Sequence, residues 1–75
     1  MKIEVLGSGC AKCGKLYEHA VEALKLSGKA GEVVKVDDIG KIVSYGVLAT
    51  PALAIDGVVI ISGKLATPEE INKLL

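Results

Sequence analysis

Two cysteines lie close together near the start of the sequence, and they are the only two in its 75 residues. Cys10 and Cys13 form a Cys-x-x-Cys motif, a spacing that suits reversible disulfide formation or the binding of a soft metal ion. A disulfide that closes so short a loop removes little entropy from the unfolded chain, so it would stabilise the fold very little. The motif therefore favours redox chemistry or metal binding over a structural bridge.

A helical pattern follows the motif. Apolar residues recur at spacings of three and four from Ala11 onward, and the pattern ends at Ser27-Gly28, which predicts one amphipathic helix. Its apolar face comprises Leu16, Ala20, Val21, Ala23 and Leu24. The cysteines then lie at the helix N-terminus, where unpaired backbone N–H groups and the helix dipole stabilise a thiolate over a thiol.

The two thiols are expected to play different roles. Cys10 precedes the first turn and should be the more exposed thiol, so we expect it to attack a partner disulfide and form a mixed disulfide. Cys13 lies about one helical turn later and should displace the reduced partner. Lys12 and Lys15 add positive charge around both sulfurs.

The elements that must position this motif begin with strands. Apolar runs rich in β-branched residues predict strands at Lys2–Leu6, Glu32–Asp37, Val47–Ile55 and Val58–Ile61. The second strand should pair in parallel with the first through the helical crossover. Asp56-Gly57, between the last two runs, favours a type I′ hairpin.

Two further helices are predicted. Ile39, Ile42 and Val43 indicate a short helix that Asp38 can cap and that Gly46 ends. In the last segment, Thr67 supplies a capping hydroxyl, Pro68 takes the first helical position and Glu70 lies three residues after the cap. The inner face of this helix is expected to comprise Ile71, Leu74 and Leu75.

The resulting order is β-α-β-α-β-β-α, over a single domain of residues 1–75. We expect an α/β fold with one mixed four-stranded sheet and helices on both faces.

Composition excludes several classes of partner. Nine basic and nine acidic residues balance without a run of like charge, so nothing predicts a nucleic-acid or membrane surface. Met1–Leu6 carries an acid and breaks at Gly7, so it lacks the apolar region of a secretory signal. We expect a cytoplasmic protein, whose reducing environment favours catalytic, sensing or metal-binding thiols.

Taken together, these features resemble the thioredoxin fold in its minimal, glutaredoxin-like form. The motif at 10–13 opens the first helix, and Thr50-Pro51 leads into the hairpin. The resemblance is closest to the small redox-active disulfide proteins of archaea and bacteria, and the run from Tyr45 to Gly57 carries it most specifically.

The resemblance implies a thiol–disulfide oxidoreductase that reduces protein disulfides. Thr50 and Pro51 would form the substrate groove, with a cis proline across from the Cys10–Cys13 disulfide and the backbone of Thr50 free to pair with an extended segment. The electron donor would be a thioredoxin reductase-type flavoprotein or a low-molecular-weight thiol. No organic cofactor is implied.

The sequence also departs from the family pattern. Gly9 and Ala11-Lys12 stand where thioredoxins usually carry Trp and Gly-Pro, and Ser62–Leu65 lacks the glutathione-binding pattern of glutaredoxins. Glu4 corresponds to the buried acid that assists proton transfer in thioredoxins; the alternative is a solvated or edge-of-sheet glutamate. The hydroxyls of Tyr17 and Tyr45 are expected to face water.

Two other functions fit the same thiols. Small copper and zinc chaperones of ferredoxin-like fold also carry Cys-x-x-Cys between a first strand and a first helix, and two thiolates suit Cu(I). Their element order ends on a strand, whereas a helix is predicted at the end of this chain, and two cysteines with one histidine do not complete a closed zinc site. A redox sensor that does not turn over substrate is the other alternative.

Overall fold

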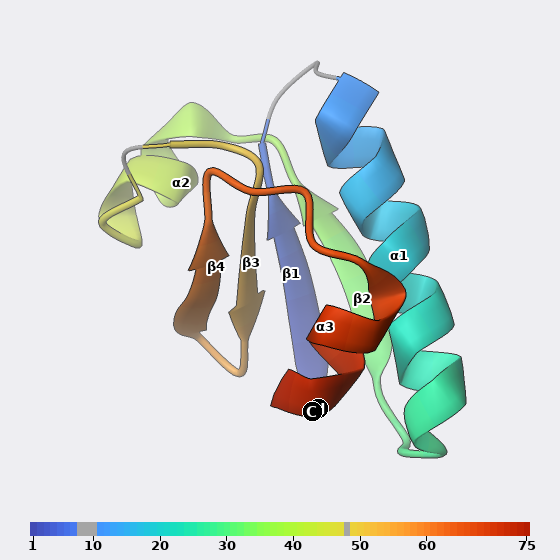
Figure 1. The fold of residues 1–75 in the computed structure, drawn as a ribbon. Helices are drawn as coiled ribbons and strands as arrows, with labels where there is room; N and C mark the ends of the chain where they lie inside the picture. The colour runs from blue at the N-terminus through green and yellow to red at the C-terminus, as the bar shows by residue number, and fades with distance from the viewer. Residues whose placement is uncertain (8–10, 48) are drawn as a thin grey trace.

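The computed structural model describes residues 1–7, 11–47 and 49–75, and Figure 1 shows the arrangement of its elements. They are β1 (Lys2–Leu6), α1 (Ala11–Ser27), β2 (Glu32–Val36), α2 (Ile39–Ser44), β3 (Ala52–Ile55), β4 (Val58–Ser62) and α3 (Pro68–Leu74). The predicted order β-α-β-α-β-β-α is confirmed. It differs from the ferredoxin-like order of the metal chaperones in the late hairpin and the closing helix.

The four strands form one mixed sheet in the order β2-β1-β3-β4. The strand β1 pairs in parallel with β2 and antiparallel with β3, and β3 pairs antiparallel with β4. Since β1 has a neighbour on each side, its residues lie in the interior of the sheet. Its carboxyl end lies at the same end of the molecule as the first turn of α1 (Figure 1).

The hairpin between β3 and β4 has the predicted turn. Asp56 and Gly57 both have positive φ, 49° and 86°, as the two central residues of a type I′ turn require. The strand before it is shorter than predicted, because β3 begins at Ala52 rather than Val47. Pro51 has no N–H to donate to a ladder, so the strand begins only after it.

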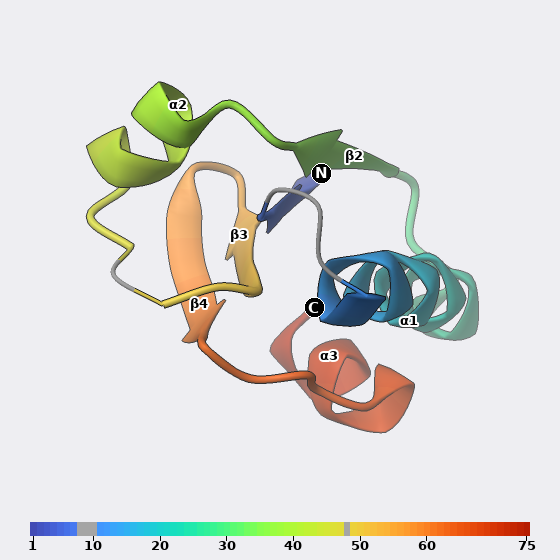
Figure 2. The same ribbon diagram turned by 90° about the horizontal axis from the view of Figure 1, so that it is seen from above.

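Helices cover both faces of the sheet, as predicted. Figure 2 shows α1 and α3 on one face and α2 on the other. The α1/α3 face buries the larger cluster: Ile3, Val5, Leu16, Ala20, Ala23, Leu53, Ile61, Ala66 and Ile71. The α2 face buries the smaller one: Leu6, Val36, Ile42, Val47, Ala52 and Ala54. Alternation along β1 therefore sends Ile3 and Val5 to one core and Leu6 to the other.

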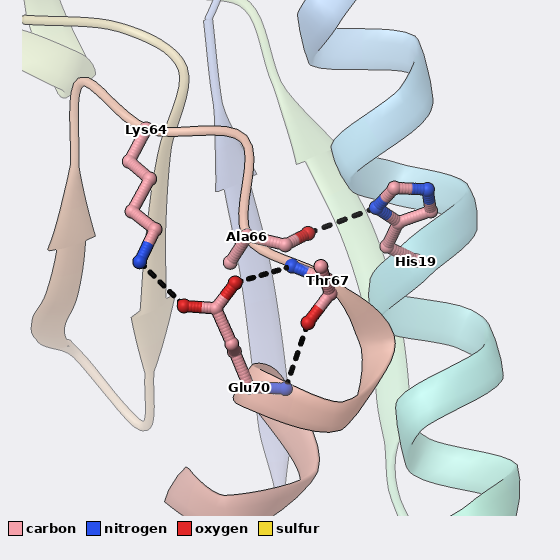
Figure 3. A network of polar contacts seen from close by, with 5 residues as sticks. All are labelled: His19, Lys64, Ala66, Thr67 and Glu70. Atoms are coloured by element: carbon pink, nitrogen blue, oxygen red, sulfur yellow. Dashed lines mark hydrogen bonds and ion pairs between the residues drawn. The ribbon is translucent and has the colours of Figure 1, made fainter.

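The last helix is fixed by polar contacts that Figure 3 shows. Glu70 N–H donates to Thr67 Oγ1 and Thr67 N–H donates to Glu70 Oε1, each at 3.1 Å, so the predicted capping box is confirmed. His19 Nδ1 on α1 lies 2.8 Å from the carbonyl oxygen of Ala66, just before the cap. This contact joins the connection between β4 and α3 to α1.

The predicted inner face of α3 is partly wrong. Ile71 is fully buried and Leu75 packs against the core, but half of the surface of Leu74 is exposed. The helix has only seven residues, so a small rotation about its axis decides which of its apolar side chains reaches the core.

Candidate functional site at the carboxyl end of β1

Cys13 lies in the first turn of α1 and is 7% exposed. Its sulfur is disulfide-bonded in the structure. Cys10 precedes Ala11, the first residue of α1, and lies outside the described residues. The predicted exposure of Cys10 and its role as attacking thiol therefore stay predictions, whereas Cys13 has the burial expected of a thiol that a partner protein does not reach directly.

Gly7 forms the surface against which Cys13 packs. The Gly7 N–H donates to the carbonyl oxygen of Val36 at 3.0 Å, which continues the pairing of β1 with β2 past the last strand residue. A Cβ added to Gly7 would overlap the Sγ of Cys13 and would lie 3.7 Å from the Cβ of Thr50. Only a residue without a side chain lets the sulfur approach the backbone this closely.

Thr50 and Cys13 are brought together by this glycine. They lie on separate elements, and the Cβ of each faces the space that a side chain at position 7 would fill. Thr50 is exposed and Pro51 is buried, and the peptide bond between them is cis, the isomer that the resemblance implied. The carbonyl oxygen of Pro51 accepts a hydrogen bond from the Gly63 N–H at 2.9 Å. The exposed residue Thr50 therefore lies near the buried Cys13.

Lys12 and Lys15 are both exposed near the start of α1. Their ammonium groups face solvent at the end of the helix that carries Cys13. They add positive charge at this end of the molecule without being buried, so water screens their effect on the thiols.

Among the predicted site residues that the structure describes, Glu4 carries a buried charge. It is 3% exposed and lies on the interior strand β1, so the solvated or edge-of-sheet alternative is wrong. The Tyr45 hydroxyl donates a hydrogen bond to its Oε1, so the expectation that this hydroxyl faces water is also wrong. The Nζ of Lys41 on α2 lies 3.4 Å from its Oε2.

These contacts hold Glu4 in its ionised form. The Tyr45 hydrogen bond, followed by the Lys41 ammonium, lowers the pKa of Glu4 below its ordinary value, although burial acts in the opposite direction. The same hydrogen bond raises the pKa of Tyr45. Lys41 of α2 and Tyr45, the C-cap of α2, approach Glu4 from one face of the sheet. Cys13 of α1 packs on the other face at Gly7, about 10 Å further along at the usual rise per residue.

Sequence reasoning missed two members of this region. In the sequence, Gly7 marks only the point where the first apolar run breaks, and its position directly between a strand and a cysteine motif was the available signal. The other is Tyr45, whose hydroxyl is expected from the sequence to face water. A glutamate inside an apolar strand needs a donor, and that was the signal for a buried hydroxyl partner.

Two kinds of feature are absent from residues 1–7, 11–47 and 49–75. Within these ranges no three His, Cys, Asp or Glu side chains gather as a metal site would require. No helix in the same part of the chain is long and apolar enough to cross a membrane.

Comparison with known proteins agrees with this geometry. A family model described as a thioredoxin domain matches residues 1–75. The chain is 43% identical over 75 residues to a thioredoxin of Methanothermobacter thermautotrophicus, covering 100% of this chain and 97% of that protein. It is 38% identical over 73 residues to a thioredoxin of Methanocaldococcus jannaschii, covering 97% and 84%. The chain therefore belongs to the thioredoxin family and is a thiol–disulfide oxidoreductase.

Proposed function

We propose that this protein reduces protein disulfides through the Cys10–Cys13 dithiol. The Cys10 thiolate attacks one sulfur of the substrate disulfide, forms a mixed disulfide and releases the other sulfur as a thiolate. The Cys13 thiolate then attacks Cys10, breaks the mixed disulfide and releases the second substrate thiol. Two electrons pass to the substrate, and the Cys10–Cys13 disulfide remains to be reduced by a donor.

The observation that carries this proposal is the position of Cys13. Its sulfur packs against Gly7 beside Thr50, and Cys13 is only 7% exposed, so a folded partner reaches this sulfur poorly. Burial thus supports Cys13 as the resolving thiol and leaves the attack to Cys10. The helix N-terminus stabilises the thiolate, with Lys12 and Lys15 adding to the local positive charge.

Thr50 and Pro51 are proposed to form the substrate groove. Thr50 is exposed next to Gly7, and Pro51 is buried behind it. An extended substrate segment laid along Thr50 would pair with its backbone as a short added strand and bring its disulfide to the motif.

Protein disulfides and a reductase are the general partners of the family. For this chain we propose that the donor is a flavoprotein reductase or a low-molecular-weight thiol, that the dithiol acts without an organic cofactor, and that the protein works in the cytoplasm. One turnover of the reductase, or two molecules of a monothiol, transfers two electrons by thiol–disulfide exchange and leaves the protein with two free thiols.

A redox titration tests the proposal. The protein is equilibrated in glutathione or dithiothreitol buffers of graded potential, the fraction of oxidised thiols is measured by mass after alkylation, and reduction of insulin is followed in parallel. We expect a reversible two-electron transition within one chain and turnover of insulin. Cu(I) and Zn(II) competition at physiological thiol concentration is the control, because stoichiometric metal retention without insulin reduction would instead support a metal-binding module.

A further inference from the structure

A short segment joins the end of α2 to the proposed substrate groove. Tyr45 is the C-cap of α2, and Gly46 follows it with a φ of 77° and donates its N–H to the carbonyl oxygen of Val43 at 2.9 Å. Val47 is buried in the core beneath α2. Tyr45 and Gly46 therefore fix the direction in which the chain leaves α2.

The far end of this segment rests on the end of β4. The Ser62 hydroxyl lies 3.4 Å from the carbonyl oxygen of Ala49, and the Gly63 N–H donates to the carbonyl oxygen of Pro51 at 2.9 Å. A Cβ added to Gly63 would come within 2.9 Å of the Cβ of Ala49, so the two chains are in close contact. Thr50 lies between these two contacts.

Glu4 supplies the anchor at the α2 end. It lies on the interior strand β1, directly opposite Ala54 of β3, whose short buried side chain leaves room on this face. The hydroxyl of Tyr45 donates to Glu4 Oε1 across this space. Lys41, one turn earlier on α2, pairs with Oε2 at 3.4 Å. The last turn of α2 is thus tied to β1, the strand that Gly7 follows.

The hydrogen bond from the Tyr45 hydroxyl to Glu4 has the properties of a strong one. Hydrogen bonds to an ionised acceptor are shorter and stronger than neutral ones, and the lowered pKa of Glu4 keeps its carboxylate ionised. Its removal would leave a buried carboxylate with one donor fewer, so the cost exceeds that of a surface contact. The bond therefore resists movement of Tyr45.

We propose that Tyr45 and Glu4 are positioning residues, whose hydrogen bond fixes the end of α2 and thereby holds Thr50 beside Cys13 for protein substrates. This inference rests on the proposed assignment of Thr50 to the substrate groove. A protein substrate would pair with the backbone of Thr50 and therefore depends on the position of Thr50. A small disulfide would react with the Cys10 sulfur without contacting Thr50.

The first test separates the two kinds of substrate. Tyr45→Phe removes the hydroxyl, and we expect the KM for insulin to rise about five- to tenfold, the loss of about one hydrogen bond, with little change in kcat. Its rate with 2-hydroxyethyl disulfide should match that of the unaltered protein. Tyr17→Phe is the matched control and should leave both rates unchanged. An unchanged KM for insulin in Tyr45→Phe, or equal loss with both disulfides, overturns the inference.

Variants of Glu4 separate positioning from proton transfer. Glu4→Gln keeps an oxygen that accepts from Tyr45, so we expect a KM for insulin close to that of the unaltered protein. Glu4→Ala removes the acceptor and should behave like Tyr45→Phe, and the double variant should be no worse than either single one because both remove the same bond. If Glu4→Gln instead lowers kcat with both disulfides, Glu4 acts on the sulfur chemistry and the positioning role is wrong.

Hydrogen exchange gives a readout that does not depend on activity. The Gly63 amide bonds to the carbonyl oxygen of Pro51, so its exchange reports whether this segment stays on β4. Tyr45→Phe should speed exchange at Gly46 and Gly63 about tenfold or more, and Tyr17→Phe should not. Unchanged exchange at both amides overturns the inference. If neither the unaltered protein nor any variant reduces insulin, the proposed function is wrong. Hydrogen exchange at Gly46 and Gly63 still tests the positioning role in that case.

Discussion

The sulfur of Cys13 lies against the backbone of Gly7, so close that a methyl group at position 7 would occupy the same space. The first turn of α1 therefore packs against the end of β1 through contact between the Cys13 side chain and the Gly7 backbone. This relationship places a buried sulfur beside Thr50 and makes the glycine part of the site.

Gly7→Ala should damage both stability and disulfide exchange. Because the added methyl overlaps the Sγ of Cys13, the first turn of α1 must shift, and we expect a loss of about 1–3 kcal/mol in the free energy of unfolding, typical of overpacking. Insulin reduction should fall at the same time. Denaturant unfolding and the insulin assay measure the two effects.

Gly14→Ala is the matched control on the other side of Cys13. Gly14 lies inside α1, and an added Cβ would meet nothing within 4 Å. Alanine is the better helix former, so this variant should gain about 0.5–1 kcal/mol. If the two substitutions destabilise the protein equally, the contact between Gly7 and Cys13 is not what makes position 7 sensitive.

Single cysteine variants should separate the roles of the two thiols. Cys10→Ser should lose all disulfide exchange with insulin, because the remaining thiol at Cys13 is buried. Cys13→Ser should accumulate a mixed disulfide that mass spectrometry detects, because no second thiol resolves it. Equal reactivity of the two variants toward a protein disulfide would contradict this assignment.

Two neighbouring apolar residues of α3 should differ sharply in their contribution to stability. Ile71 is fully buried between α1 and the sheet, so Ile71→Ala should cost about 2–5 kcal/mol of unfolding free energy. Half of the surface of Leu74 is exposed, so Leu74→Ala should cost less than about 1 kcal/mol. Denaturant titrations of the two variants compare them, and the reverse order would mean that α3 is rotated about its axis.

Acid should weaken the cap of α3. Lys64, followed by the Thr67 N–H, lowers the pKa of Glu70 from 4.5 to about 2. A carboxyl whose pKa is depressed on folding contributes stability that is fully present above pH 4.5 and is lost as the pH falls toward 2. Unfolding curves across this range should show the loss, and Glu70→Gln should reduce its pH dependence.

Glu69→Gln is the control for this titration. It removes a carboxylate from the same helical turn but leaves the contacts of Glu70 with Lys64 and Thr67 in place. Its unfolding free energy should keep the acid dependence of the unaltered protein. A loss of that dependence in Glu69→Gln would assign the effect to the charge of the helix as a whole.

The elements could be predicted because their signals are local. The Asp56-Gly57 turn adopts positive φ at both residues whatever surrounds it, and Thr67 with Glu70 satisfies the first N–H groups of α3 within one turn. The order of these elements leaves few ways to arrange a four-stranded sheet with a crossover helix. Fold class therefore followed from the sequence.

The site depended more on contacts between distant segments. In the sequence, Glu4 is an isolated acid in an apolar strand. Only the packing of α2 on β1 shows that Glu4 is buried and accepts a hydrogen bond from Tyr45. From the sequence, Gly7 only ends the first strand, and its contact with Cys13 of α1 appears only in the folded structure. Leu74 fits the apolar pattern of α3 but is half exposed, because a helix this short can rotate.

The sequence by itself determined the two thiols, their place at the start of a helix and the succession of strands, helices and turns, since each depends on residues a few positions apart. Tertiary structure decided which side of β1 each residue faces, how closely α1 approaches Gly7, and which partner the buried Glu4 finds. These depend on packing between elements, where a shift of one methyl group or a rotation of part of a turn changes the neighbours of a side chain.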